Sequence, residues 1–111
     1  MMKPAYFAPL TAFDRDDQVV RFIAELGVRV LVARADGQWY ACVARCPHGD
    51  VELGDQPLRG TNLTCGGHKY QFDLRTGMCT HTRHLRLTML QALIDGDSIF
   101  VRFAPHASVA P

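Results

Sequence analysis

The chain of 111 residues has no long apolar run, no strong net charge and no internal repeat. No apolar stretch approaches the ~20 residues that a membrane-spanning helix needs. Residues 1–6 contain one lysine but lack the apolar segment of a secretory signal. We therefore expect a cytoplasmic protein that does not enter a membrane. A net charge of +1 argues against a nucleic-acid binder that relies on phosphate attraction. The length favours one domain, residues 1–111.

Long amphipathic helices are also missing, and short β-type runs separated by turn residues predict an all-β fold. The clearest is 28–33, followed by the hairpin dipeptide Asp36-Gly37 and a return strand over 38–43. Other strands are expected at 19–24, 62–64, 70–74, 85–94 and 98–103. Residues 14–18 could form a helical turn capped by Asp14 or a polar loop, and the sequence does not separate these two alternatives.

Motifs for substrate chemistry are absent as well. The chain has no phosphate-cradling loop of the G-x-x-x-x-G-K type, no dinucleotide fingerprint between a strand and a helix, and no plausible catalytic triad. We therefore predict no catalytic residues and expect a protein that is not itself an enzyme.

What the chain does contain is a C-x-H motif, Cys46 and His48, and 16 residues later a C-x-x-H motif, Cys65 and His68. Two thiolates and two imidazoles fit zinc, or a Rieske [2Fe–2S] cluster in which two histidines replace two cysteines on one iron. Zinc sites usually pair like ligands in one loop. Here each loop carries one of each, which favours the cluster because each loop must reach both irons. A zinc site and a chance grouping of buried thiols stay as alternatives.

Glycines beside these motifs support a bound anionic group. Gly49 follows His48, and Gly66 and Gly67 separate the second pair. Glycine lets the backbone approach a cluster closely and turn its N–H groups toward it.

The remaining cysteines and the extra histidines have simpler interpretations. Cys42 and Cys79 are expected to be small core residues, kept reduced in a cytosolic protein. His81 and His84 belong to a solvated basic loop. The segment 75–86, with Arg75, Arg83 and Arg86, contains no acidic residue and would favour an acidic patch on a partner.

Residues 46–53 and 64–77 together resemble the bacterial Rieske-type ferredoxins, which serve aromatic-ring dioxygenases and toluene-type diiron monooxygenases. The resemblance covers residues 6–103. It implies an antiparallel β-sandwich with a two-loop cluster-binding subdomain at about residues 44–80. It also implies one [2Fe–2S] cluster per chain, with Cys46 and Cys65 on the inner iron and His48 and His68 on the outer iron.

The function implied by this resemblance is one-electron transport. Such a protein takes electrons from a flavin-dependent NAD(P)H reductase and passes them to a terminal oxygenase of aromatic or alkene compounds. It would act as a monomer and dock transiently at the tip that carries His48 and His68. Two alternatives stay open, the small Rieske subunit of an NAD(P)H nitrite reductase and a zinc-stabilised interaction module.

The resemblance also bears on the reduction potential. High-potential Rieske proteins place a serine two residues, and a tyrosine four residues, after the second histidine. Here Tyr70 and Phe72 occupy those positions, and Phe72 has no hydroxyl to donate. Donors aimed at the cluster sulfurs raise the potential, so we predict a value at the low end of the Rieske range.

Overall fold

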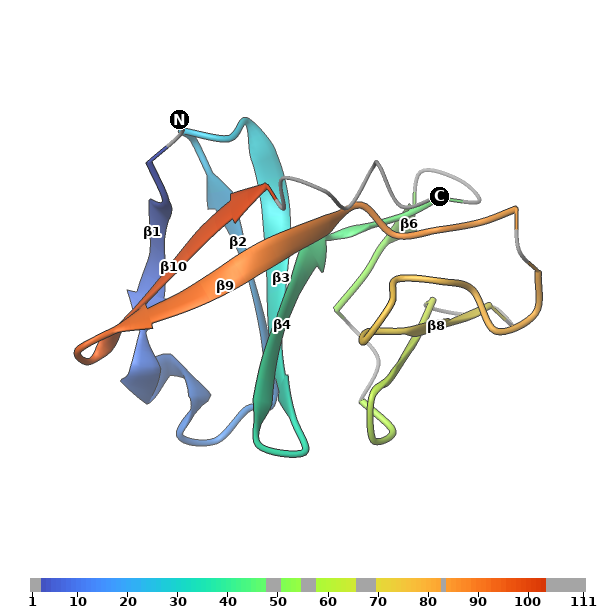
Figure 1. Ribbon diagram of the computed structural model, residues 1–111, viewed down its shortest axis with the longest axis horizontal. Coiled ribbons are helices and arrows are strands. Elements are labelled where there is room, and N and C mark those ends of the chain that lie inside the picture. The colour runs from blue at the N-terminus through green and yellow to red at the C-terminus, as the bar shows by residue number, and fades with distance from the viewer. Residues whose placement is uncertain (1–2, 48–50, 55–57, 66–69, 83, 104–111) are drawn as a thin grey trace.

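A six-stranded antiparallel sheet forms the larger part of the molecule (Figure 1). The computed structural model describes residues 3–47, 51–54, 58–65, 70–82 and 84–103. The strand order is β1-β10-β9-β4-β3-β2. The bounds are Ala5–Pro9 for β1, Gln18–Ile23 for β2, Val28–Ala35 for β3, Gln38–Val43 for β4, Met89–Asp95 for β9 and Ser98–Phe103 for β10. The predicted all-β class is confirmed.

The β3–β4 hairpin forms as the sequence predicts. Ala35 pairs with Gln38 across the turn. Asp36 and Gly37 both have positive φ, at 53° and 74°. A two-residue turn of this kind matches the twist of the flanking strands, and aspartate followed by glycine tolerates it at little cost.

The N-terminal region differs from the expectation. Strand β1 was not predicted, and it pairs with β10 through a register shift between Tyr6 and Ala8. The helical turn is a 3₁₀ helix, η1 (Leu10–Phe13), which ends before residues 14–18. Asp14 donates its N–H to the Thr11 carbonyl at 3.1 Å and follows the helix instead of starting one. The polar-loop alternative is therefore correct for residues 14–17, and Gln18 begins β2. None of the described residues belongs to a helix long and apolar enough to cross a membrane.

Strand β3 is buried on both faces, which explains why its sequence is a continuous apolar run. Val30 and Val32 belong to a core enclosed by the main sheet, whose edge strands β1 and β2 contact each other. Leu31 and Ala33 belong to a second core, shared with the smaller part of the molecule. All four side chains are fully buried.

The smaller part is the segment between β4 and β9, which we call the small subdomain (residues 44–88; Figure 1, right). It contains two short ladders. Strand β5 (Arg45–Cys46) pairs with β6 (Val51–Glu52), and β7 (Asn62–Thr64) pairs with β8 (Gln71–Asp73). The strand expected at 85–94 is regular only from Met89 onward.

The shared core joins the two parts. Its buried residues are Leu31, Ala33, Cys42, Ala44, Cys46, Leu53, Leu63, Cys65, Phe72, Leu74, Cys79 and Leu87. Because these side chains come from the main sheet and from both small ladders, the small subdomain packs against the outer face of β3 and β4 and is not a freely hinged loop.

Gly54 is a close contact between the small subdomain and the sheet. Its φ is +110°, and a Cβ there would lie 2.5 Å from Cγ2 of Val20 on β2. We expect Gly54→Ala to lower the free energy of unfolding by at least about 2 kcal/mol, because strain and overpacking act together. Gly27→Ala is the matched control, with φ +72° and nothing within 4 Å of the added Cβ. Thermal unfolding at one heating rate compares the two variants. Equal losses of stability in both would contradict the close contact at Gly54.

Candidate metal centre

The two predicted cysteine ligands lie in the shared core. Cys46 ends β5, and Cys65 directly follows β7. Both are completely buried. The structure therefore brings Cys46 and Cys65 into one apolar environment. The two predicted histidine ligands, His48 and His68, lie outside the described residues.

Each cysteine sits where a short β-ladder closes a loop at its base. Cys46 pairs with Val51, which closes the base of the predicted first loop. The N–H of Cys65 donates to the Tyr70 carbonyl at 2.9 Å, which closes the base of the predicted second loop. Each ladder thus anchors the backbone of its cysteine at the point where a loop carrying a histidine begins.

This donor arrangement fits a two-iron cluster. Two buried thiols can serve as anionic ligands when a metal neutralises them, and apolar surroundings control the access of water to the site. Imidazoles in the adjoining loops would complete a set of two sulfur and two nitrogen ligands. Among the described residues no three His, Cys, Asp or Glu side chains converge, so no rival metal site is seen in this part of the chain.

The other two cysteines are core residues, as predicted. Cys42, on β4, pairs with Leu31 on β3 and Met89 on β9. Burial raises the pKa of its thiol to about 12 because the thiolate would lose its hydration. Cys79 is also buried, and its Sγ accepts a weak hydrogen bond from the His81 N–H at 3.5 Å.

The charges of segment 75–86 need one correction. Arg75 does face an acidic group, since its Nη2 lies 2.9 Å from Oδ2 of Asp73 and its Nε donates to both oxygens of that carboxylate. Hydrogen bonding to Arg75 lowers the pKa of Asp73. Arg75 is therefore compensated, while Arg83 lies outside the described residues.

Trp39 and Tyr40 are neighbours on β4. Both are half-buried. They lie on opposite faces of β4, and Trp39 packs against the main-sheet core while Tyr40 packs against the shared core. Since both faces of β4 are covered, neither residue reaches full exposure.

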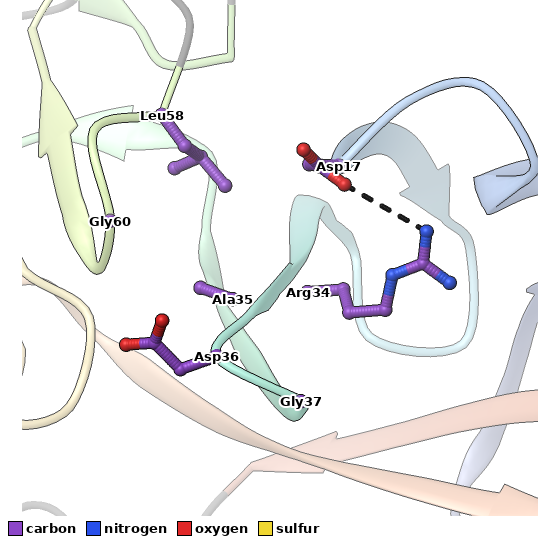
Figure 2. A pocket seen from close by; sticks show the side chains of 7 residues that line it. All are labelled: Asp17, Arg34, Ala35, Asp36, Gly37, Leu58 and Gly60. Atoms are coloured by element: carbon purple, nitrogen blue, oxygen red, sulfur yellow. Dashed lines mark ion pairs between the residues drawn. The ribbon is translucent and has the colours of Figure 1, made fainter.

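A surface hollow of about 410 Å³ lies away from the two cysteines (Figure 2). It is lined by Asp17, Arg34, Ala35, Asp36, Gly37, Leu58 and Gly60. Arg34 forms an ion pair with Asp17 at 3.8 Å, donates to the Phe13 carbonyl at 2.8 Å and lies over the Trp39 ring. These contacts brace the start of β2 against the β3–β4 hairpin, which gives the arginine a structural role.

Comparison with known proteins identifies the class. The Rieske [2Fe–2S] domain family model matches residues 8–91, and the chain belongs to this family. The domain carries a Rieske-type [2Fe–2S] cluster, so the cluster prediction is confirmed and the zinc alternative is set aside.

Individual relatives show which kind of Rieske protein the chain resembles. The chain is 27% identical over 93 residues to the ferredoxin component of the p-cumate 2,3-dioxygenase system of Pseudomonas putida, covering 82% of this chain and 79% of that protein. The ferredoxin of carbazole 1,9a-dioxygenase from Nocardioides aromaticivorans IC177 superposes with a TM-score of 0.80 at 24% identity, covering 93% of this chain and 100% of that one.

A complex of reduced oxygenase and oxidised ferredoxin in carbazole 1,9a-dioxygenase matches with a TM-score of 0.75 at 20% identity, over 88% of this chain and 91% of that one. At these identities the two solved structures establish the fold. Together with the p-cumate relative, they confirm the resemblance to Rieske ferredoxins of aromatic-ring dioxygenase systems.

Cys42 should resist alkylation in the folded protein. A thiol reacts as the thiolate, and burial both blocks access and keeps this group neutral well above the ordinary pKa of 9.0. We expect iodoacetamide at pH 9 to leave Cys42 unmodified in the folded chain and to modify it once urea unfolds the chain, as measured by peptide mass spectrometry. Equal labelling in both states would contradict the burial of this side chain.

Proposed function

We propose that this chain is a ferredoxin that carries single electrons from a flavin-dependent NAD(P)H reductase to a terminal oxygenase acting on an aromatic compound. The observation that carries the proposal is the sequence likeness to the p-cumate ferredoxin component, which extends over most of both chains. The fold shared with the carbazole dioxygenase ferredoxin supports it. In this role the chain is an electron-transfer component and not the enzyme that transforms the substrate.

The proposed ligands are Cys46 and Cys65 on the inner iron and His48 and His68 on the outer iron. Support comes from the complete burial of both thiols in one core and from the ladders that close the two loops. When bound, the cluster accepts and releases one electron. The chain's own contribution is to exclude water around the thiols and to hold the two loop bases in place.

Docking is proposed at the loops, because the cysteines lie too deep for a partner to approach. Pro47, the first residue of the first loop, is exposed, whereas Cys46 beside it is fully buried. Tyr70, at the base of the second loop, is half-buried and packs against the shared core. Exposure therefore increases from each cysteine toward its loop, and a partner would meet the histidine side first.

The cellular setting is part of the same proposal. Cys42 and Cys79 are free thiols, in keeping with a reducing cytoplasm. A reductase partner and a monomeric state suit a diffusing carrier.

Reconstitution tests the proposed function. The purified chain, reduced by NADH and a flavin reductase, should be reoxidised by a terminal aromatic-ring oxygenase from the same organism, and product formation should depend on the chain. Co-purification with a large sirohaem protein, with no transfer to the oxygenase, would instead support the nitrite reductase alternative.

Cluster assembly in substituted variants should distinguish the proposed ligands from the other cysteines. We expect Cys46→Ser and Cys65→Ser to abolish cluster assembly, because each removes a thiolate bonded to iron. Cys42→Ala and Cys79→Ala serve as controls, since both side chains occupy the same core and should leave iron and sulfide content unchanged. Full iron content and an unchanged visible spectrum in a His68→Ala variant would show that His68 is not a ligand.

The reduction potential should lie in the lower half of the Rieske range of roughly −150 to +300 mV. Phe72 is fully buried in the same core as both cysteines and offers no hydroxyl to stabilise added negative charge. Protein-film voltammetry measures the midpoint. A value above roughly +100 mV would contradict both the tuning argument and the carrier role.

A further inference from the structure

Residues 77–87 form a hairpin, which we call the arm. The Cys79 N–H donates to the Leu85 carbonyl at 3.1 Å, and the Leu87 N–H donates to the Gly77 carbonyl at 2.7 Å. Between them Met78 and Arg86 form an antiparallel bridge. Apart from Arg83, which lies outside the described residues, the arm is therefore held by its own backbone hydrogen bonds.

The arm is also fixed to β8. Phe72 and Cys79 form an antiparallel bridge. The Asp73 N–H donates to the Met78 carbonyl at 2.9 Å, and the Thr80 N–H donates to the Gln71 carbonyl at 2.8 Å. The arm thus extends the β7–β8 ladder and moves with it.

This register places the turn of the arm beside the base of the second loop. Gln71, whose carbonyl accepts the hydrogen bond from the Thr80 N–H, directly follows Tyr70. Tyr70 accepts the hydrogen bond from the Cys65 N–H that closes the loop. A side chain near the turn of the arm therefore has a fixed position relative to the site.

One side of the arm is apolar and the other is basic. Cys79 and Leu87 are buried in the shared core, and Leu85 packs against it. His81, His84 and Arg86 are exposed. The Arg86 side chain has no ion pair with any described residue, and the sequence contains no Asp or Glu between Asp73 and Asp95. The arm therefore exposes positive charge that no acidic residue of its own segment compensates.

The main sheet carries exposed aspartates at the turns where β2 and β4 begin and β3 and β9 end. Arg15 and Arg34 lie in or beside these turns, and Arg34 is paired with Asp17. The exposed aspartates in these turns are Asp14, Asp16, Asp17, Asp36, Asp95 and Asp97. One of these turns borders the small subdomain, since Asp36 lines the hollow together with Leu58 and Gly60, so the aspartates do not form a separate negative end of the molecule.

We propose that the exposed basic side of the arm is a docking surface for an acidic face of the protein that accepts the electron. This inference rests on the proposed function and adds the chemistry of the partner. The arm attracts such a face to the side of the second loop. An exposed charge of this kind orients an encounter and raises its rate even when the net charge is small.

Small charged oxidants can test the charge at this face without a known partner. The reduced holoprotein is mixed in a stopped-flow instrument with ferricyanide, a trianion, or with tris(phenanthroline)cobalt(III), a trication. Each takes one electron, becoming ferrocyanide or the cobalt(II) complex, and the chain returns to its oxidised state. An ionic strength of about 0.1 M limits the range of each charge to roughly 10 Å.

The variant Arg86→Glu reverses the charge on the arm. Arg21→Glu is the matched control, because Arg21 is an exposed arginine on β2 of the main sheet. We expect Arg86→Glu to slow ferricyanide reduction about threefold or more and to accelerate the cobalt reaction, with both effects lost in high salt. Arg21→Glu should change neither rate. In turnover with the terminal oxygenase, Arg86→Glu should raise the ferredoxin concentration needed for half-maximal rate by a similar factor.

If both variants respond equally to the charged oxidants, or if neither responds, the arm is not a docking surface. Unchanged oxygenase turnover in Arg86→Glu would likewise overturn it. These results are distinct from failure of the proposed function, which would appear in the wild-type protein as a reduced chain unable to pass its electron to the oxygenase. Visible spectra of both variants must match the wild type, so that a rate change reports charge and not loss of the cluster.

Discussion

The pairing of β4 with β9 is the constraint on which the site depends. Ala41 pairs with Leu90 and Cys42 with Met89, and the Val43 N–H donates to the Thr88 carbonyl at 2.9 Å. The chain leaves the main sheet after β4 and returns at β9, so this ladder holds both ends of the small subdomain together. Closing a long loop at its base lowers the entropic cost of ordering what lies within it. Both cysteines lie inside this closed segment.

Burial on both faces of the sheet then fixes the orientation of the small subdomain. Leu31 and Ala33 contribute to the shared core from β3, and Leu63 and Phe72 contribute from the β7–β8 ladder. Gly77 reinforces the contact, since a Cβ at this position would lie 2.9 Å from Cγ of Met89. The sheet therefore acts as a rigid support, and the apolar residues around the thiols are the same residues that join the two parts.

Local signals explain what could be predicted from the sequence. The Asp36-Gly37 turn and the strands beside it follow from turn chemistry and strand propensity, and the pairing of one cysteine with one histidine in each loop indicated the cluster. Strand β1 was missed because it depends on distant pairing with β10 and not on its own alternation. The arm was missed for a related reason, since it depends on the register of β8 with a segment that carries no strand signal. The Asp73–Arg75 ion pair is local, two residues apart, and was missed because Asp73 lies just outside the segment 75–86.

The most direct test of the account is pulsed electron paramagnetic resonance of the dithionite-reduced protein. The account predicts a reduced [2Fe–2S] signal with couplings to two histidine nitrogens, one of which disappears when His48 or His68 is labelled selectively or replaced by cysteine. A signal without nitrogen coupling would show a cluster with cysteine ligands alone. A colourless, diamagnetic protein that contains zinc would contradict the account altogether.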